Sequence, residues 1–266
     1  MMSNDQRLVS IITPTYNSER FIEHTIASVQ AQEYTEYEHI VIDDCSNDKT
    51  IELIEGKASQ DDRIILIKQS ENLGAGAARN AGIKIAKGRY LAFLDADDYW
   101  HPKKLLLQLQ LMREKKIPMV YSQYYIVKGE INVPRYKINS PKTTTYKKML
   151  RNDYMGFLTV VYDTSVVGKM YMPTIRRRQD WAYKLKILKK IDFAVGIQTP
   201  LAYYRTGNSS LSSNKLRLIK YNFMVYHKEL GNSFIVSLFL MGVFLIHYFY
   251  FKLTSKKEVK SDSALF

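Results

Sequence analysis

Short apolar runs alternate with segments of helical periodicity along the first 116 residues of the chain. Four of these runs predict buried strands, at residues 9–12, 39–42, 63–68 and 90–94. Four helices are predicted between these strands and after them. The first covers residues 19–31 and the second begins near Lys49. The third ends at Lys87 and Gly88, and the fourth begins at Pro102. Strands that alternate with helices in this way predict an α/β fold with a mostly parallel, doubly wound sheet.

The pattern changes after residue 116, where long polar loops separate the apolar runs. Strands are predicted at residues 119–127, 157–162, 193–195 and 201–204. Residues 176–190 predict a basic loop followed by an amphipathic helix. We expect a mixed second half of the same domain, and we divide the chain into residues 1–116, 117–214 and 215–266.

The last part combines a basic helical pattern at residues 215–228 with an apolar segment, residues 234–251, that has no formal charge when His247 is neutral. As a helix the apolar segment would be roughly 27 Å long, close to the thickness of a bilayer core. It is rich in Phe and Tyr, and lysines flank it. A buried core helix is one interpretation. We favour a helix that contacts or spans a membrane.

The composition is that of a globular protein, with 46% hydrophobic and 24% charged residues. The single cysteine, Cys45, excludes an internal disulfide framework and favours a reducing compartment. The polar residues 1–7 predict no signal peptide.

Charge is divided unevenly between the front and the back of the chain. Residues 1–100 contain 10 Lys+Arg and 17 Asp+Glu, a net −7, whereas the remainder contains 29 and 9, a net +20. Basic surface can bind nucleic acid, anionic lipid or a phosphorylated substrate. Because the sequence shows no zinc knuckle or RNP-type aromatic strand, nucleic acid is not an expected partner.

Three aspartates, Asp95, Asp97 and Asp98, follow the predicted strand at residues 90–94. Like charges this close repel each other unless water or a cation lies between them. A solvated turn is the simpler interpretation. The alternative is a site for Mg²⁺ or Mn²⁺, which prefer oxygen ligands and often take one or two carboxylates plus diphosphate oxygens.

The pair Asp43 and Asp44 and the Gly-rich stretch from Gly74 to Arg79 also follow predicted strands. Ligands bind beyond the carboxyl ends of parallel strands, so these features are expected at one edge of the sheet. The Gly-rich stretch lacks the last glycine of a dinucleotide fingerprint and the Gly-Lys-Ser/Thr of a P-loop. It predicts either a flexible helix entry or backbone close to a ligand, with Arg79 as a cation for a phosphate or carboxylate.

Asp180 follows Arg176, Arg177 and Arg178 at a predicted helix start. An aspartate at such a position is commonly an N-cap. The alternative is an acid/base group beside arginines that hold a phosphate.

Five segments occur in a specific order: VSIITPTYN, HIVIDDCSNDKT, NLGAGAARNAG, YLAFLDADDYW and RRRQDWAYKL. Together they resemble the motif series of glycosyltransferase family 2, over residues 8–211. The resemblance implies a GT-A fold and an inverting enzyme that depends on a nucleotide sugar. One departure is Gln179, which stands where the family more often has an acidic residue.

The resemblance also implies roles for individual residues. Asp44 is expected to contact the base of the nucleotide, Asp97 to bind the metal, and Asp180 to act as the catalytic base. The whole nucleotide-sugar site is expected to comprise Pro14, Tyr16, Asp44, Arg79, Asp95 and Ala96.

We therefore predict a metal-dependent hexosyltransferase of bacterial cell-surface polysaccharide biosynthesis, with Mn²⁺ or Mg²⁺ as its cofactor. It would move a sugar from a nucleotide sugar, expected to be a UDP-sugar, to a lipid-linked or polysaccharide acceptor. Residues 1–116 would bind the donor, residues 117–214 the acceptor, and residues 215–266 the cytoplasmic face of the cell membrane. The alternatives are a nucleotidyltransferase, which would release pyrophosphate, and a non-catalytic nucleotide-binding membrane protein.

Overall fold

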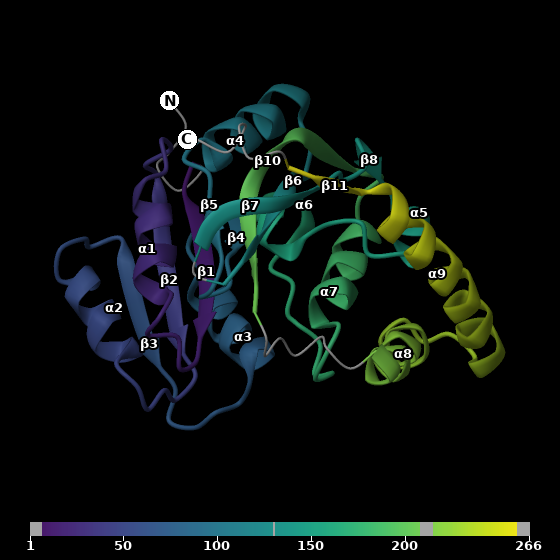
Figure 1. Cartoon of the computed structure of the whole chain (residues 1–266), viewed down its shortest axis with the longest axis horizontal. Helices are drawn as coiled ribbons and strands as arrows, with labels where there is room; N and C mark the ends of the chain where they lie inside the picture. The colour runs from purple at the N-terminus through teal and green to yellow at the C-terminus, as the bar shows by residue number, and fades with distance from the viewer. Residues whose placement is uncertain (1–6, 130, 208–214, 260–266) are drawn as a thin grey trace.

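A computed structural model describes residues 7–129, 131–207 and 215–259 of the chain (Figure 1). Its first half contains the four predicted strands, which lie parallel in the order β3-β2-β1-β4. Their bounds are β1 Val9–Thr15, β2 Tyr37–Asp43, β3 Ile64–Lys68 and β4 Tyr90–Phe93. The predicted doubly wound unit is thus confirmed.

Helices cover both faces of these strands because successive strand residues point to opposite faces. Ile11 of β1 packs toward α4 and Ile12 toward α3. Apolar side chains of α1 and α2 join those of β2 and β3 on the face that α4 also covers. The helix bounds are α1 Ile22–Gln30, α2 Thr50–Ala58, α3 Ala75–Ile85 and α4 Lys104–Lys115.

The second half extends the same sheet as a mixed one. Strand β9 lies antiparallel to both β4 and β6, and the sheet continues through β7 to β11. The long strand β10 pairs in parallel with β6 and antiparallel with the short strands β5 and β8. Their bounds are β5 Tyr99–Trp100, β6 Met119–Lys128, β7 Ile131–Ile138, β8 Thr143–Thr144, β9 Val161–Asp163, β10 Ala194–Thr206 and β11 Lys256–Glu258.

Several elements of this half differ from the sequence prediction. The predicted strand at 157–162 begins as the 3₁₀ turn η2, Phe157–Thr159, and only its end enters β9. The two strands predicted at 193–195 and 201–204 are parts of β10. Polar loops were expected where β7 and the helix α5, Tyr146–Arg151, occur. These elements depend on pairing and packing with distant segments, which local periodicity does not record.

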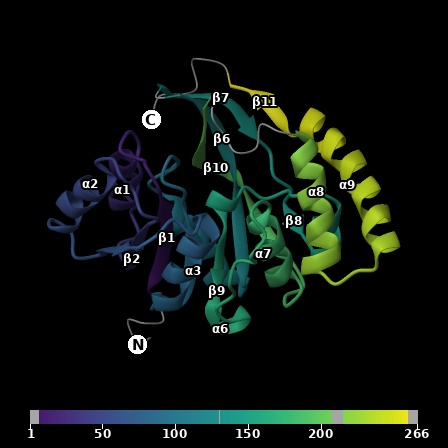
Figure 2. The ribbon, with the colours of Figure 1, turned by 90° about the horizontal axis from the view of Figure 1, so that it is seen from below.

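The remaining helices lie on one side of this half. They are the short α6 Thr164–Val167, α7 Gln179–Leu188, α8 Lys215–Met224, its π-helical continuation η3 Val225–Glu229, and α9 Phe234–Thr254. Helices α8 and α9, both predicted, lie side by side at the edge of the molecule (Figure 2). The core cluster that includes α3 and α7 also includes Tyr226 of η3 and Phe244 of α9, so the C-terminal segment is continuous with the main core.

Candidate active site

Asp44 holds the Gly-rich loop at the carboxyl end of β2. Its buried carboxylate accepts the backbone N–H groups of Leu73 at 2.9 Å and Gly74 at 2.7 Å. Gly74 has φ +88°, a conformation that side chains disfavour, and α3 begins at the next residue. Pro14 lies near the end of β1, and the exposed Tyr16 follows that strand. The structure therefore brings these predicted residues to one edge of the sheet.

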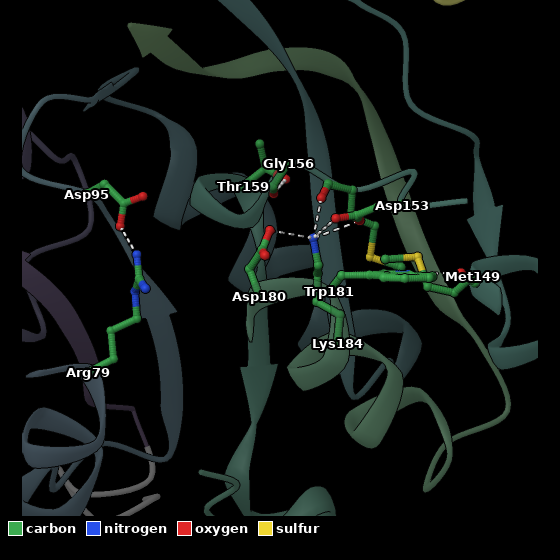
Figure 3. Close-up of polar contacts among 10 residues, drawn as sticks. Arg79, Asp95, Met149, Asp153, Gly156, Thr159, Asp180, Trp181 and Lys184 are labelled. Atoms are coloured by element: carbon green, nitrogen blue, oxygen red, sulfur yellow. Dashed lines mark hydrogen bonds and ion pairs between the residues drawn. The ribbon is translucent and has the colours of Figure 1, made fainter. Parts of the chain in front are cut away.

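Arg79 of α3 reaches the carboxyl end of β4 and forms an ion pair with Asp95 (Figure 3). The arginine is buried, with its guanidinium 5.3 Å from the ring centre of Phe157. Among the described residues, no acceptor reaches its Nε. Asp95 is partly exposed, and the following Ala96 is buried with its carbonyl accepting the hydroxyl of Thr25.

Asp98, the third aspartate of the cluster, has a structural role. Its buried carboxylate accepts the backbone N–H of Arg205 at 2.8 Å, and Nε of Arg205 donates to the carbonyl of Asp97. These bonds attach β10 to the loop after β4. Burial, with repulsion from Asp97 and Asp95, raises the pKa of Asp98 well above its ordinary value.

Asp97 differs from Asp98 because it is exposed. The surrounding protein still removes part of its hydration, and this desolvation together with repulsion from Asp95 raises the pKa of Asp97 to about 6. Among the residues that the structure describes, no group of three or more Asp, Glu, His or Cys side chains could hold a metal ion. Protein ligands for a metal here would be one or two carboxylates, the arrangement in which substrate oxygens complete the coordination of Mg²⁺ or Mn²⁺.

Asp180 lies in the first turn of α7. The N-cap of this helix is Arg178, which has the left-handed φ of 62°, so the interpretation of Asp180 as the N-cap is wrong. The Asp180 carboxylate is 3.7 Å from Nζ of Lys184 and its side chain is 38% exposed, whereas Lys184 is fully buried. Lys184 also donates to the carboxylate of Asp153 at 2.8 Å (Figure 3).

The charge environment keeps Asp180 ionised. Desolvation alone would raise its pKa, but the cations of Lys184, Arg178 and Arg79 outweigh this effect and lower the pKa below its ordinary value. The position of Asp180 in the first helical turn adds to this preference for negative charge. A carboxylate that is ionised and partly exposed is suited to accept a proton.

Phe157 of η2 shows that the two groups of charged residues are close to each other. Its ring centre is 5.3 Å from the guanidinium of Arg79, which pairs with Asp95, and 5.8 Å from Nζ of Lys184, which pairs with Asp180. The negative charges of both groups, together with burial, also raise the pKa of Tyr204 of β10. Arg79 likewise influences Asp180 from α3. The aspartates from the loop after β4 and the aspartate of α7 therefore form one site, although 82 residues or more separate them in the sequence.

Gln179 connects the two halves directly. A Cβ atom at Gly76 of α3 would overlap the side-chain amide of Gln179, so the first turns of α3 and α7 are in contact. Sequence reasoning noted Gln179 only as a departure from a motif. It missed Tyr204, Arg205, Lys184 and Asp153, whose contacts join distant segments and leave no local signal.

The enzyme class follows from comparison with known proteins. Residues 10–178 match Glycosyl transferase family 2. The chain belongs to this family. The matched range ends just before Gln179 and Asp180, so the role of Asp180 depends on the geometry described above.

Relatives of this family 2 glycosyltransferase are similar over most of their length. TuaG of Bacillus subtilis strain 168, whose name refers to teichuronic acid biosynthesis, is 41% identical over 228 residues, which are 85% of this chain and 90% of TuaG. WfgD of Escherichia coli, a UDP-Glc:alpha-D-GlcNAc-diphosphoundecaprenol beta-1,3-glucosyltransferase, is 37% identical over 218 residues, 81% of this chain and 84% of WfgD.

A solved structure confirms the fold of the glycosyltransferase. Residues 1–349 of Staphylococcus aureus TarS, in complex with UDP-GlcNAc, superpose with a TM-score of 0.72 at 22% identity, over 91% of this chain and 73% of that one. The GT-A-like fold with a mixed second half, predicted above, is therefore confirmed.

Helix α7 of this glycosyltransferase packs against the C-terminal helices. Trp181, next to Asp180, is fully buried and donates its indole N–H to the carbonyl of Met149 at 3.0 Å. Its ring centre lies 5.3 Å from that of Tyr226 and 4.9 Å from that of Phe244. The position of Asp180 thus depends on α5, η3 and α9 as well as on α7.

Proposed function

We propose that this glycosyltransferase moves a sugar from a UDP-sugar to a hydroxyl group of a lipid-linked or polysaccharide acceptor, with inversion at the anomeric carbon. The names of TuaG and WfgD support this choice of donor and acceptor classes. The observation that supports the proposal is the partly exposed Asp180 carboxylate, 3.7 Å from Nζ of the buried Lys184, on a helix whose first turn contacts the first turn of α3.

The donor site is formed at the carboxyl ends of β1, β2 and β4. The nucleoside would lie by Pro14, Tyr16 and the loop that Asp44 holds, with Asp44 at the base. Its diphosphate would then face Arg79 and the first turns of α3 and α7, where backbone N–H groups and helix dipoles favour anions.

A divalent metal fits beside this diphosphate. Desolvation and the neighbouring Asp95 carboxylate raise the pKa of Asp97, so a cation beside it would be favourable, and its exposed carboxylate can reach a ligand. Asp97 would hold Mn²⁺ or Mg²⁺, and Asp95, already paired with Arg79, would face the sugar nucleotide. Bound metal would neutralise charge on the departing diphosphate.

Asp180 is proposed as the general base. The acceptor oxygen forms its bond to the anomeric carbon while the bond to the diphosphate breaks, and the hydroxyl proton moves to the Asp180 carboxylate. The electron pair of the broken bond leaves with UDP. Arg176 and Arg177, which precede α7, could hold phosphate groups of the acceptor and so bring its hydroxyl to the site.

Membrane association is proposed for α9. The most apolar 18-residue window of this 21-residue helix has a mean hydropathy of 2.1, and only 17% of that window is buried. An enzyme that uses cytoplasmic nucleotide sugars and a lipid-linked acceptor would work at the cytoplasmic face of the membrane, and α9 supplies a surface suited to that location.

A screen of nucleotide sugars tests the proposal. The full chain would be incubated with UDP-sugars, an undecaprenyl-diphosphate-linked sugar and Mn²⁺ or Mg²⁺, with UDP release and extended glycolipid as readouts. We expect one UDP-sugar to yield both products. Release of pyrophosphate would show nucleotidyl transfer instead, and UDP binding without turnover of any donor would show a non-catalytic binding protein.

A further inference from the structure

We infer that α9 lies in the plane of the membrane surface and does not cross the bilayer. This inference rests on the membrane association proposed above and goes beyond it by assigning the orientation of the helix. The length of α9 does not decide the question, because 21 residues form a helix of about 31 Å, enough for either arrangement. The contacts of its two faces and its two ends decide it.

The outer face of α9 is apolar along its whole length. Large apolar side chains that are exposed lie on it from the first residue, Phe234, to Leu253, which is 83% exposed. Nine of the eighteen large exposed apolar side chains in the described part of the chain lie on this one helix. They are Phe234, Ile235, Val236, Leu238, Phe239, Ile246, Phe249, Tyr250 and Leu253. A helix covering a water-soluble domain would have a polar outer face instead.

The inner face of α9 is packed against the catalytic domain at helical spacing. Ser237, Met241 and Phe244 are buried, and Phe244 contacts Trp181 of α7. Two turns further along the helix, the ring of Phe251 lies 5.0 Å from that of Tyr154. These contacts run along the length of the helix, so it lies against the domain side-on.

Both ends of α9 are attached to the same domain. Before the helix, Tyr226 of η3 is buried and donates its hydroxyl to the carbonyl of Leu150. After the helix, the chain turns at Ser255, whose carbonyl accepts the N–H of Asn139, and β11 pairs antiparallel with β7. A spanning helix would put its two ends on opposite sides of the bilayer. It would break either the β11–β7 pairing or the contacts of η3 and Phe244, and it would leave backbone groups unpaired.

The chemistry of the exposed surface selects a lipid monolayer as the partner. An interfacial helix buries its apolar side below the headgroups while basic residues remain among them. Exposed lysines lie near both ends of α9: Lys228 precedes the helix, Lys252 lies in its last turn, and Lys257 follows it. They match anionic headgroups on one surface, which requires both ends on one side of the bilayer.

Side-specific labelling tests the orientation, with the native Cys45 as the reference. Cys45 is exposed on the catalytic domain and is the only cysteine of the chain. Lys228→Cys and Lys257→Cys would be made separately in a Cys45→Ser background. Each chain would be treated with a membrane-impermeant maleimide in intact spheroplasts and in inside-out vesicles. We expect both positions to label as Cys45 does in the parent chain, in inside-out vesicles only. Labelling of either position from the periplasmic side would overturn the inference.

Flotation on vesicles separates this inference from the proposed reaction. The full-length double variant Ile235→Glu/Leu253→Glu would be compared with Val166→Glu, a matched change at an exposed apolar residue of α6. We expect the variant on α9 to lose at least tenfold in flotation with vesicles containing phosphatidylglycerol, while the control floats as the parent does. Unchanged flotation of the α9 variant would refute the lipid-facing surface. Transfer to a soluble acceptor analogue, measured in parallel, reports on the proposed reaction alone.

Discussion

Phe244 of α9 packs against Trp181 of α7 with ring centres 4.9 Å apart, so the residue beside the proposed base touches the helix proposed to contact the membrane. The indole is fully buried, which fixes the start of α7 against the C-terminal helices. The proposed membrane contact and the proposed base therefore depend on the same packing contacts. Removing α9 is expected to disturb the active site as well as any attachment.

Substitutions at two phenylalanines of α9 distinguish a loss of packing beside the proposed active site from a loss of membrane contact. Phe244→Ala opens a cavity beside Trp181 and is expected to lower the free energy of unfolding by about 3–5 kcal/mol, with reduced transfer. Phe239→Ala, at a residue that is 69% exposed, should leave thermal stability and transfer to a soluble acceptor unchanged. Thermal melts and transfer rates check both. Equal stabilities for the two variants would show that the Phe244 contact is unimportant.

Asp180→Asn tests the base directly. The amide cannot accept the acceptor's proton, so we expect transfer to fall roughly 10²- to 10⁴-fold, the usual worth of general-base catalysis. UDP affinity should be unchanged, and the melting temperature should fall only slightly, because Asn keeps the size of the side chain and Lys184 keeps its bond to Asp153. Asp192→Asn, an exposed acidic residue after α7, is the matched control. If Asp180→Asn transfers sugar at nearly the parental rate, Asp180 is not the general base.

Asp97→Asn tests the metal site. We expect turnover to fall by at least about 10²-fold, the scale of losing a key electrostatic contact, and Mn²⁺ or Mg²⁺ affinity to fall with it. Activity of the parent should be lost in excess EDTA. Asp62→Asn, at an exposed position before β3, is the control. Parental activity of Asp97→Asn, or undiminished activity in EDTA, contradicts the assignment.

The pH dependence of metal binding follows from the same residue. Because the pKa of Asp97 is raised to about 6, its carboxyl group is largely protonated at pH 5 and ionised at pH 7. Protons compete with the metal, so Mn²⁺ affinity should rise from pH 5 to pH 7 and then level. Titrations followed by Mn²⁺ electron paramagnetic resonance would show this. This increase of Mn²⁺ affinity with pH should disappear in Asp97→Asn. An increase that persists in the variant would come from another titratable group.

Lys184→Met removes the buried cation shared by Asp153 and Asp180. An uncompensated buried carboxylate is expected to cost about 3–5 kcal/mol of stability. Since Lys184 contributes to the lowered pKa of Asp180, the acidic limb of the pH–rate profile should move to higher pH. Lys186→Met, which removes a partly exposed pair with Glu229, should cost no more than about 1 kcal/mol. An unmoved acidic limb would show that Lys184 has no influence on the base.

Gly76 and Gln179 should behave as a coupled pair. Gly76→Ala places a methyl group against the Gln179 amide and is expected to displace the start of α7 and slow transfer. Gln179→Ala makes room, so the double variant Gly76→Ala/Gln179→Ala should recover stability and rate relative to Gly76→Ala. Additive effects in this cycle would mean that the two helix starts do not constrain each other.

The amino-acid sequence by itself determined the parallel half and the edge at which its polar residues gather. Apolar strands, helix boundaries and the Gly-rich entry to α3 are local patterns. Once the strands are parallel, Asp44 and the Asp95–Asp98 loop must lie at the same edge. The apolar character of residues 234–251 was equally visible.

Only the tertiary structure decided how this edge becomes a site. Arg205 bonds to Asp98 across 107 residues of the sequence, and Lys184 bonds to Asp153 across 31. Contacts between segments so far apart leave no periodic pattern in the sequence. In the structure, the N-cap of α7 is Arg178, and the two strands predicted at 193–195 and 201–204 are parts of one strand, β10. The orientation of α9 depends on β11 pairing with β7, because an apolar helix fits either arrangement in a bilayer until the attachment of its ends is known.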